Sequence, residues 1–147
     1  MDQTHEVEIL LVEDSPEDVE LTMRALTSRH LANQLFVCRD GAEAIDFFFG
    51  DAPNALRDIG VIPRMILLDL NLPKVDGLEV LRRLKADERT RAIPVVVLTS
   101  SAEQPDIAAA YRLGANSYIV KPVDFEAFAR AVSEVGLYWL LLNEQPR

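Results

Sequence analysis

The chain of 147 residues is long enough to bury one apolar core and has little room for a second folded module. Hydrophobic residues make up 49% and charged residues 27%, as in globular proteins, and no apolar run is long enough to span a bilayer. The net charge of -9 repels nucleic acid phosphates, and the densest basic stretch, residues 82–91, is interrupted by Asp87 and Glu88. We therefore expect neither a membrane protein nor a nucleic-acid-binding protein.

Strand-like runs alternate with helical segments along the chain. Apolar runs, most of them rich in β-branched residues, predict strands over residues 8–12, 35–38, 65–70, 95–99 and 117–120. Helices are predicted over residues 16–28, 42–49, 77–86, 103–113 and from residue 125 onward. The first helix starts at a clear signal, since Ser15 offers a capping hydroxyl, Pro16 suits the first helical position, and Glu17 and Asp18 are early acids.

The alternation of strand and helix, repeated five times, predicts the fold class. Most of the strand runs are apolar throughout, which indicates that helices cover both faces of the sheet. We expect a doubly wound α/β fold with a five-stranded parallel sheet, whose ligand site lies outside the carboxyl ends of the strands. Residues 1–136 would form this domain. Residues 51–63 contain two prolines and a glycine and predict a long surface loop.

Residues 137–147 are predicted to extend the last helix beyond the domain. Leu137, Tyr138 and Leu141 would project from the side opposite to Trp139, so the helix would be apolar on both sides. Large exposed apolar patches are uncommon on monomers, and we therefore expect a homodimer built on the last helix and this extension. The alternative is that the tail folds back on its own domain.

The cellular compartment is suggested by two features. Residues 1–8 lack the basic and apolar regions of a secretory signal. Cys38 is the only cysteine, it lies in an apolar run, and it cannot form an internal disulfide. A cytoplasmic protein is the expectation.

Polar side chains stand at the carboxyl ends of four predicted strands. Glu13 and Asp14 follow the first, Asp69 ends the apolar part of the third, Thr99 ends the fourth, and Lys121 follows the fifth. In a parallel sheet these ends converge, which would bring three carboxylates, a hydroxyl and an ammonium into one crevice. Such a set of oxygen ligands suits a hard ion such as Mg²⁺ that keeps several waters.

The chemistry of this set is that of phosphoryl transfer. Asp69 would act as a nucleophile that forms an acyl phosphate, and the metal and Lys121 would neutralise the transferred charge. Thr99 could donate a hydrogen bond to a phosphoryl oxygen. Taken singly, Asp14 and Asp76 are better explained as helix caps, and Thr99 as a hydroxyl that bonds to local backbone. The case for a site rests on the set as a whole.

The order and spacing of these residues resemble the receiver domain of two-component response regulators, over about residues 8–135. The matching segments are Val12-Glu13-Asp14, Leu68-Asp69-Leu70-Asn71-Leu72-Pro73, Asp76-Gly77, Thr99, Tyr118 and Lys121-Pro122. The resemblance implies a (βα)5 flavodoxin-like receiver fold like that of the single-domain chemotaxis regulators.

The resemblance also assigns roles to residues. It implies that Glu13 and Asp14 hold Mg²⁺ together with Asp69 and the backbone carbonyl of Asn71, and that Asp69 accepts a phosphoryl group from a histidine kinase. By the same resemblance Lys121 contacts that group, Thr99 and Tyr118 form a coupled switch pair, and the peptide bond between Lys121 and Pro122 is cis. The alternative for Tyr118 is a purely structural role, as a half-buried aromatic ring whose hydroxyl is bonded to water.

The long loop before Asp69 and residues 137–140 resemble one subgroup, the single-domain regulators paired with bacterial phytochrome kinases. We therefore expect phosphorelay signalling through protein contacts, with no enzymatic activity beyond self-catalysed phosphotransfer and autodephosphorylation. One alternative is an Mg²⁺-dependent phosphatase that uses Asp69 as its nucleophile. Asn71 stands where such an enzyme would need a general acid, and no cap domain fits. The other alternative is a degenerate receiver that only docks to partners.

Overall fold

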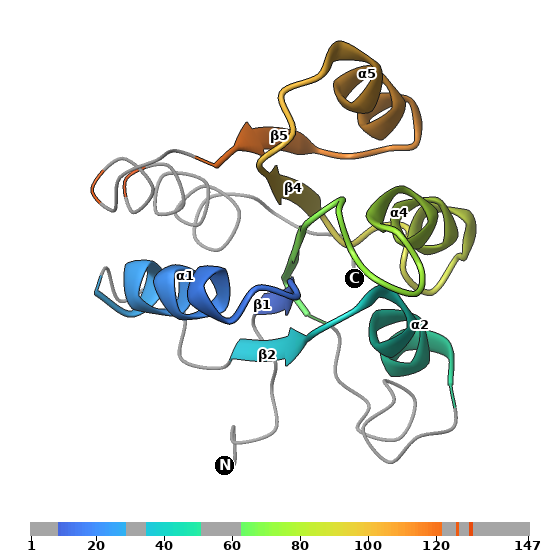
Figure 1. Cartoon of the computed structure of the whole chain (residues 1–147). Coiled ribbons are helices and arrows are strands. Elements are labelled where there is room, and N and C mark those ends of the chain that lie inside the picture. Colours follow the sequence, from blue (N-terminus) through green and yellow to red (C-terminus); the bar gives the residue numbers. More distant parts are fainter. Residues whose placement is uncertain (1–8, 29–34, 51–62, 122–125, 127–129, 131–147) are drawn as a thin grey trace.

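The computed structural model describes residues 9–28, 35–50, 63–121, 126 and 130. One parallel sheet of five strands, in the order β2-β1-β3-β4-β5, crosses the molecule between helices (Figure 1). The elements in chain order are β1 (Ile9–Val12), α1 (Pro16–Ser28), β2 (Leu35–Cys38), α2 (Gly41–Phe49), β3 (Met65–Leu68), α4 (Gly77–Ala86), β4 (Val95–Thr99), α5 (Gln104–Arg112) and β5 (Ser117–Val120). The predicted doubly wound α/β fold is confirmed.

Alternate residues of each central strand face opposite layers. Figure 1 shows α1 on one side of the sheet and α2 and α4 on the other. The core on the α1 side contains Leu11 and Leu67, and the core on the opposite side contains Leu10 and Leu68. Since both faces are covered, the central strands are apolar at every position, which explains why their sequences do not alternate.

The order of the strands reverses once in the sheet. From β1 the chain moves outward to β2 and then crosses back to β3 on the other side of β1. In such a sheet a crevice opens where the order reverses, outside the carboxyl ends of the two strands concerned. Here those strands are β1 and β3, which lead to Glu13 and Asp69.

The predicted element boundaries hold to within about two residues. The third strand differs most, because it ends at Leu68 rather than at residue 70. At that point the chain turns, and the carbonyl of Leu70 accepts hydrogen bonds from the N–H groups of Leu72 and Gly77 instead of continuing a ladder. Residues 51–62 of the predicted loop, Pro122, the last helix apart from residues 126 and 130, and the extension over residues 137–147 lie outside the described residues.

At the amino end of the sheet, Lys85 joins α4 to the starts of β4 and β5. Its Nζ donates to the carbonyls of Arg91 at 3.0 Å and Ile93 at 2.8 Å, and lies 3.5 Å from Oδ1 of Asn116. Burial lowers the pKa of Lys85. None of the helices in the described part of the chain is long and apolar enough to cross a membrane.

Candidate functional site

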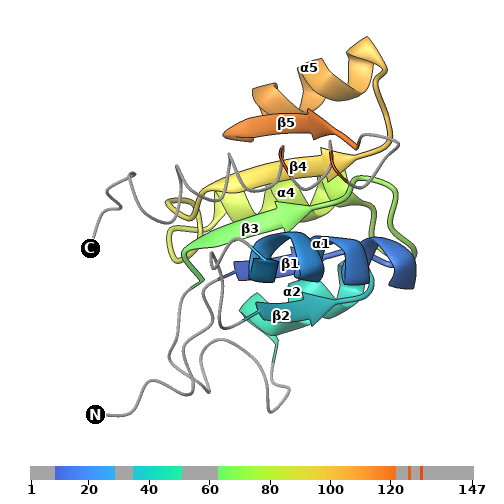
Figure 2. The same cartoon turned by 90° about the vertical axis from the view of Figure 1, so that its left-hand side faces the viewer.

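The carboxyl ends of the strands converge as the sequence predicts. In Figure 2 the strand arrows point to one side, where the segments that follow β1, β3 and β4 meet. The N–H of Asp69 donates to the carbonyl of Val12, and the N–H of Glu13 to that of Cys38. The N–H of Lys121 likewise donates to the carbonyl of Thr99. Glu13, Asp69 and Lys121 are thus each anchored by a backbone hydrogen bond to the end of a neighbouring strand.

Three carboxylates form one cluster at this edge. Glu13, Asp14 and Asp69 each offer an oxygen, and these oxygens lie within 4.8 Å of one another. Glu13 is 2% exposed and Asp69 6% exposed, whereas Asp14 is open to solvent. The cluster is therefore buried at Glu13 and Asp69 and open to solvent at Asp14, which suits an ion that retains some of its water.

Lys121 is the cation that faces this cluster. Its Nζ donates to Oε1 of Glu13 and to Oδ2 of Asp18, both at 2.7 Å, and lies 3.5 Å from Oδ2 of Asp69. The side chain of Lys121 is only 10% exposed. Asp18 was not among the predicted site residues, because its place three residues after Ser15 is explained by its role as an early acid of α1.

One ammonium does not compensate the carboxylates that surround it. Burial, opposed in part by the hydrogen bond from Lys121 and reinforced by the charge of Asp69, raises the pKa of Glu13 to about 7. Burial by itself lowers the pKa of Lys121, but its hydrogen bonds to Asp18 and Glu13 outweigh that effect and the net shift is upward. Lys121 stays charged at neutral pH, and the site favours a further positive charge.

The loop after β3 closes tightly behind Asp69. The backbone N–H of Asn71 donates to Oδ1 of Asp69 at 3.3 Å, while the Asn71 side chain is exposed. Gly77 lies against the backbone of Asp69 and Leu70, and a Cβ there would collide with both. Asp76 caps α4 by accepting from the N–H of Glu79, so the cap interpretation of Asp76 is confirmed.

Thr99 and Tyr118 are linked through one residue that the sequence did not single out. The N–H of Ser101 approaches Oγ1 of Thr99 at 3.5 Å, and the hydroxyl of Tyr118 donates to the carbonyl of Ser101 at 2.9 Å. Thr99 is fully buried and Tyr118 is half-buried. The Tyr118 hydroxyl therefore has a protein partner, and no sequence pattern would have predicted that the partner is a backbone carbonyl.

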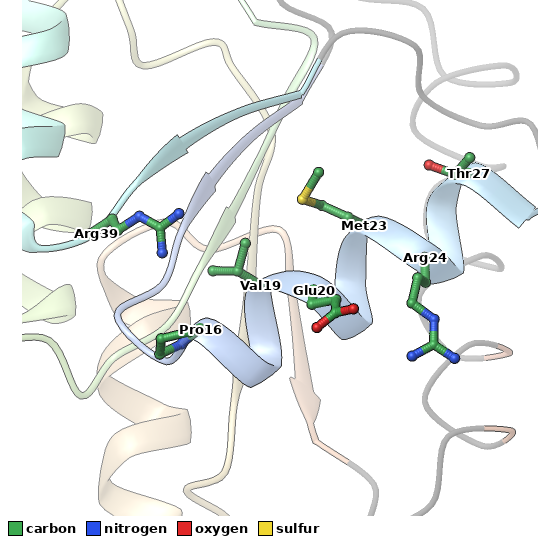
Figure 3. Close-up of a pocket in the computed structure, with 7 residues that line it drawn as sticks. All are labelled: Pro16, Val19, Glu20, Met23, Arg24, Thr27 and Arg39. Atoms are coloured by element: carbon green, nitrogen blue, oxygen red, sulfur yellow. The ribbon is translucent and has the colours of Figure 1, made fainter.

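A large open groove is separate from the acidic cluster. It follows α1 and is lined by Pro16, Val19, Glu20, Met23, Arg24, Thr27 and Arg39. Figure 3 shows Val19 and Met23 on the side of α1 toward the strands, with Arg39 extending toward them from the end of β2. None of the residues that line the groove belongs to the carboxylate cluster. Its place along an exposed helix suits contact with another macromolecule better than capture of a small substrate.

The donor set fits a divalent cation. All three carboxylates in the cluster are hard oxygen donors, and they outnumber the ammonium of Lys121 that faces them, so part of their negative charge lacks compensation. A hard ion such as Mg²⁺ would supply that compensation. The contribution of the Asn71 carbonyl, expected from the resemblance, remains a prediction.

The chain matches known proteins along nearly its whole length. The family model for the response regulator receiver domain matches residues 9–133. The chain is 46% identical, over 140 residues, to the probable methanogenesis regulatory protein FilR2 of Methanothrix harundinacea, a match that covers 94% of this chain and 86% of FilR2. It is 40% identical over 134 residues to the response regulator Rcp1 of Synechocystis sp., covering 90% of this chain and 88% of Rcp1.

Two solved structures share the fold along the chain. The phosphorylated cyanobacterial phytochrome response regulator RcpA superposes with a TM-score of 0.88 at 36% identity, covering 97% of this chain and 99% of RcpA. The Mn²⁺-bound form of Rcp1 superposes with a TM-score of 0.84 at 36% identity, covering 96% of this chain and 99% of Rcp1. A receiver of similar structure thus binds a divalent cation.

Proposed function

The chain belongs to the response regulator receiver family, and we propose that it is a phosphoacceptor in a phosphorelay, with Asp69 as the residue that is phosphorylated. The observation that carries the proposal is the arrangement around Asp69. Asp69 is a buried carboxylate with two further acids within 4.8 Å that could hold a divalent cation beside it. That cation, together with the ammonium of Lys121 at 3.5 Å, would compensate an incoming dianionic group.

The proposed reaction is transfer from a phosphohistidine of a kinase. A carboxylate oxygen of Asp69 attacks phosphorus, the new P–O bond forms as the P–N bond breaks, and the imidazole leaves and regains its proton from solvent. Lys121 would contact a phosphoryl oxygen, and Thr99 would donate its hydroxyl to another. Glu13, Asp14, Asp69 and the carbonyl of Asn71 would hold Mg²⁺, which when bound would neutralise part of the phosphoryl charge.

Phosphorylation would be reported by a shift between two conformations. Thr99 and Tyr118 both contact Ser101, so a movement of the Thr99 hydroxyl toward a phosphoryl oxygen would disturb the residue that holds the Tyr118 ring. We propose Thr99 and Tyr118 as the switch pair on this basis. The signal would leave through protein contacts, and the groove along α1 is a surface that offers them.

A phytochrome-type histidine kinase is the proposed phosphodonor, on the strength of the likeness to RcpA. FilR2 is named as a regulator of methanogenesis, so the identity of the kinase has to be tested separately. We further propose a cytoplasmic homodimer formed through the last helix and residues 137–147, with no contact to nucleic acid. Light scattering of this chain and of a variant truncated before Leu137 checks the dimer, and monomers in both samples would refute it.

The test of the central proposal is a phosphorylation assay. The protein is incubated with Mg²⁺ and a small phosphodonor such as acetyl phosphate and analysed by intact mass, alongside Asp69→Asn. Asp76→Asn is the matched control, because Asp76 is a nearby acid that caps a helix and asparagine caps equally well. We expect one phosphoryl adduct in the natural sequence and in the control, none in Asp69→Asn, and none when EDTA removes the metal. As an acyl phosphate, the adduct should be removed by alkali and by hydroxylamine.

Two readouts separate the alternatives, namely the mass adduct formed with acetyl phosphate and the phosphate released from a phosphomonoester. A phosphatase would release inorganic phosphate from phosphomonoesters over many turnovers. The residue two positions after Asp69 is Asn71, which offers no acid for the leaving group. A degenerate receiver would show no adduct at all, and that result would refute phosphoacceptance while leaving the fold unaffected.

A further inference from the structure

The starts of three helices share a sequence pattern that the structure uses in different ways. Each has a capping side chain followed three residues later by an acid, namely Ser15 with Asp18, Asp40 with Glu43, and Asp76 with Glu79. In all three pairs the cap accepts from the N–H of the acid, at 3.3, 2.7 and 3.0 Å. The backbone role of the pattern is therefore the same at α1, α2 and α4.

The carboxylates of the three acids go to different partners. In the usual capping box the acid accepts from the backbone N–H of the cap itself. At α1 that N–H, on Ser15, donates to Oε2 of Glu13 instead, and the Asp18 carboxylate accepts from Lys121. Glu43 stays local and accepts from the N–H of Arg39, and Glu79 pairs with Arg82 on its own helix. The α1 acid alone among these three reaches the carboxylate site.

The hydrogen bonds of Lys121 show what Asp18 contributes. An ammonium has three N–H donors, and two of them point to Glu13 and Asp18 at 2.7 Å. The distance of 3.5 Å to Oδ2 of Asp69 is longer than a good hydrogen bond. The ammonium is thus held near Asp69 without being bonded to it. Glu13 belongs to the cluster of carboxylates that could hold a metal and Asp18 does not.

We propose that Asp18 is a positioning residue for phosphoryl transfer, which holds the Lys121 ammonium off Asp69 and within reach of an incoming phosphoryl oxygen. The inference rests on the proposed function of Asp69. Without the Asp18 carboxylate, Lys121 would be drawn to Asp69, and that ion pair would have to break before Asp69 could attack. Preorganised charge accelerates a reaction because it needs no rearrangement at the moment of transfer.

The experiment compares Asp18→Asn with the natural sequence in the rate of Asp69 phosphorylation by acetyl phosphate. Asparagine keeps the size of the side chain and removes its charge. We expect phosphorylation to slow about five-fold, the scale of a partly exposed ion pair, with Mg²⁺ affinity changed less than about two-fold. Asp18→Glu restores the carboxylate and should recover most of the rate.

Glu43→Gln is the matched control, since it neutralises the equivalent acid of α2. An equal slowing in this variant would show that the loss arises from helix starts in general and would overturn the proposal. A double-mutant cycle with Lys121→Met adds a second check. Asp18→Asn should change the rate in the natural background and have no further effect once Lys121 is gone, because the two residues act as one unit.

The experiments distinguish the role of Asp18 from the phosphorylation of Asp69 itself. If the natural sequence is phosphorylated and Asp18→Asn reacts at the same rate, Asp18 has no positioning role and Asp69 keeps its own. If Asp69 takes up no phosphoryl group in the natural sequence, both proposals are wrong. A slowing that Asp18→Glu fails to rescue, or that persists undiminished in the Lys121→Met background, would also overturn the role of Asp18.

Discussion

Two lysines, at opposite ends of the same sheet, show how partners determine what a half-buried cation does. Lys121, at the carboxyl end, donates to the carboxylates of Glu13 and Asp18. Lys85, at the amino end, donates to the backbone carbonyls of Arg91 and Ile93. Carboxylates raise the pKa of Lys121 in spite of its burial, whereas burial lowers the pKa of Lys85.

The two lysines differ because the partners of Lys121 are charged carboxylates, whereas those of Lys85 are neutral carbonyl dipoles. Carbonyl oxygens accept the hydrogen bonds of Lys85 but do not neutralise its charge. Lys85 therefore links three elements of the fold, and no excess of negative charge surrounds it. Several carboxylates surround the single ammonium of Lys121, so the site keeps an excess of negative charge. That excess favours the binding of a further cation. The amino end is a structural joint, and the carboxyl end is an electrostatic site.

The largest expected effect comes from Lys121→Met. Removing a charged donor from a preorganised site typically slows a reaction by about 100-fold or more, so phosphorylation of Asp69 by acetyl phosphate should slow by roughly that factor. Intact mass against time measures the rate. Lys85→Met is the control at the other end of the sheet and should phosphorylate at the normal rate. Equal slowing in both variants would refute the division of roles.

Protonation of Glu13 should make the stability of the metal-free protein depend on pH. Its pKa is about 7 in the fold, against 4.5 for the ordinary side chain, so the folded state holds the proton more tightly. The stabilisation is complete below about pH 4.5 and is lost as the pH rises through 7, by up to about 3 kcal/mol. Urea unfolding in EDTA at several pH values checks this, and subtraction of the Glu13→Gln curve isolates Glu13. A difference that does not vary with pH would contradict it.

Lys85→Met should lower stability with little effect on chemistry. The substitution leaves the carbonyls of Arg91 and Ile93 without their donor, and we expect a loss of about 2 kcal/mol in the free energy of unfolding. Urea denaturation at pH 7.5 measures it. Arg82→Met is the control on the same helix, and it should cost much less because it breaks only an exposed pair with Glu79. Similar losses in the two variants would contradict the structural role of Lys85.

The smallest expected effect is that of Gly114→Ala, next to Lys85. Gly114 has φ of 109°, and a Cβ there would lie 3.0 Å from Cγ of Lys85. An alanine strains the backbone and presses on the lysine stem, so the free energy of unfolding should fall by about 1 kcal/mol. Thermal unfolding checks the loss. Phosphorylation of Asp69 should be unchanged, and a slower reaction would mean that the two ends of the sheet are coupled.

Local sequence signals predicted most of the fold. The helix start at Ser15 and Pro16 is placed correctly because a cap and a proline act within one turn of chain. The third strand was predicted two residues too long, since Leu70 is apolar and buried and only its hydrogen bonds show that it lies in a turn. The strand-end residues Glu13, Asp14, Asp69, Thr99 and Lys121 were all predicted to converge on one edge, and they do.

The sequence by itself determined the alternation of elements, the apolar strands and the identity of the acids that end them, because these depend on neighbours along the chain. Only the tertiary structure decided how the charges are shared. Asp18 and Ser101 look like ordinary helix-start and loop residues until the sheet places them against Lys121 and Tyr118. A side chain from α1 and one from the end of β5 are more than a hundred positions apart, and no local pattern records that the fold brings their charges to 2.7 Å.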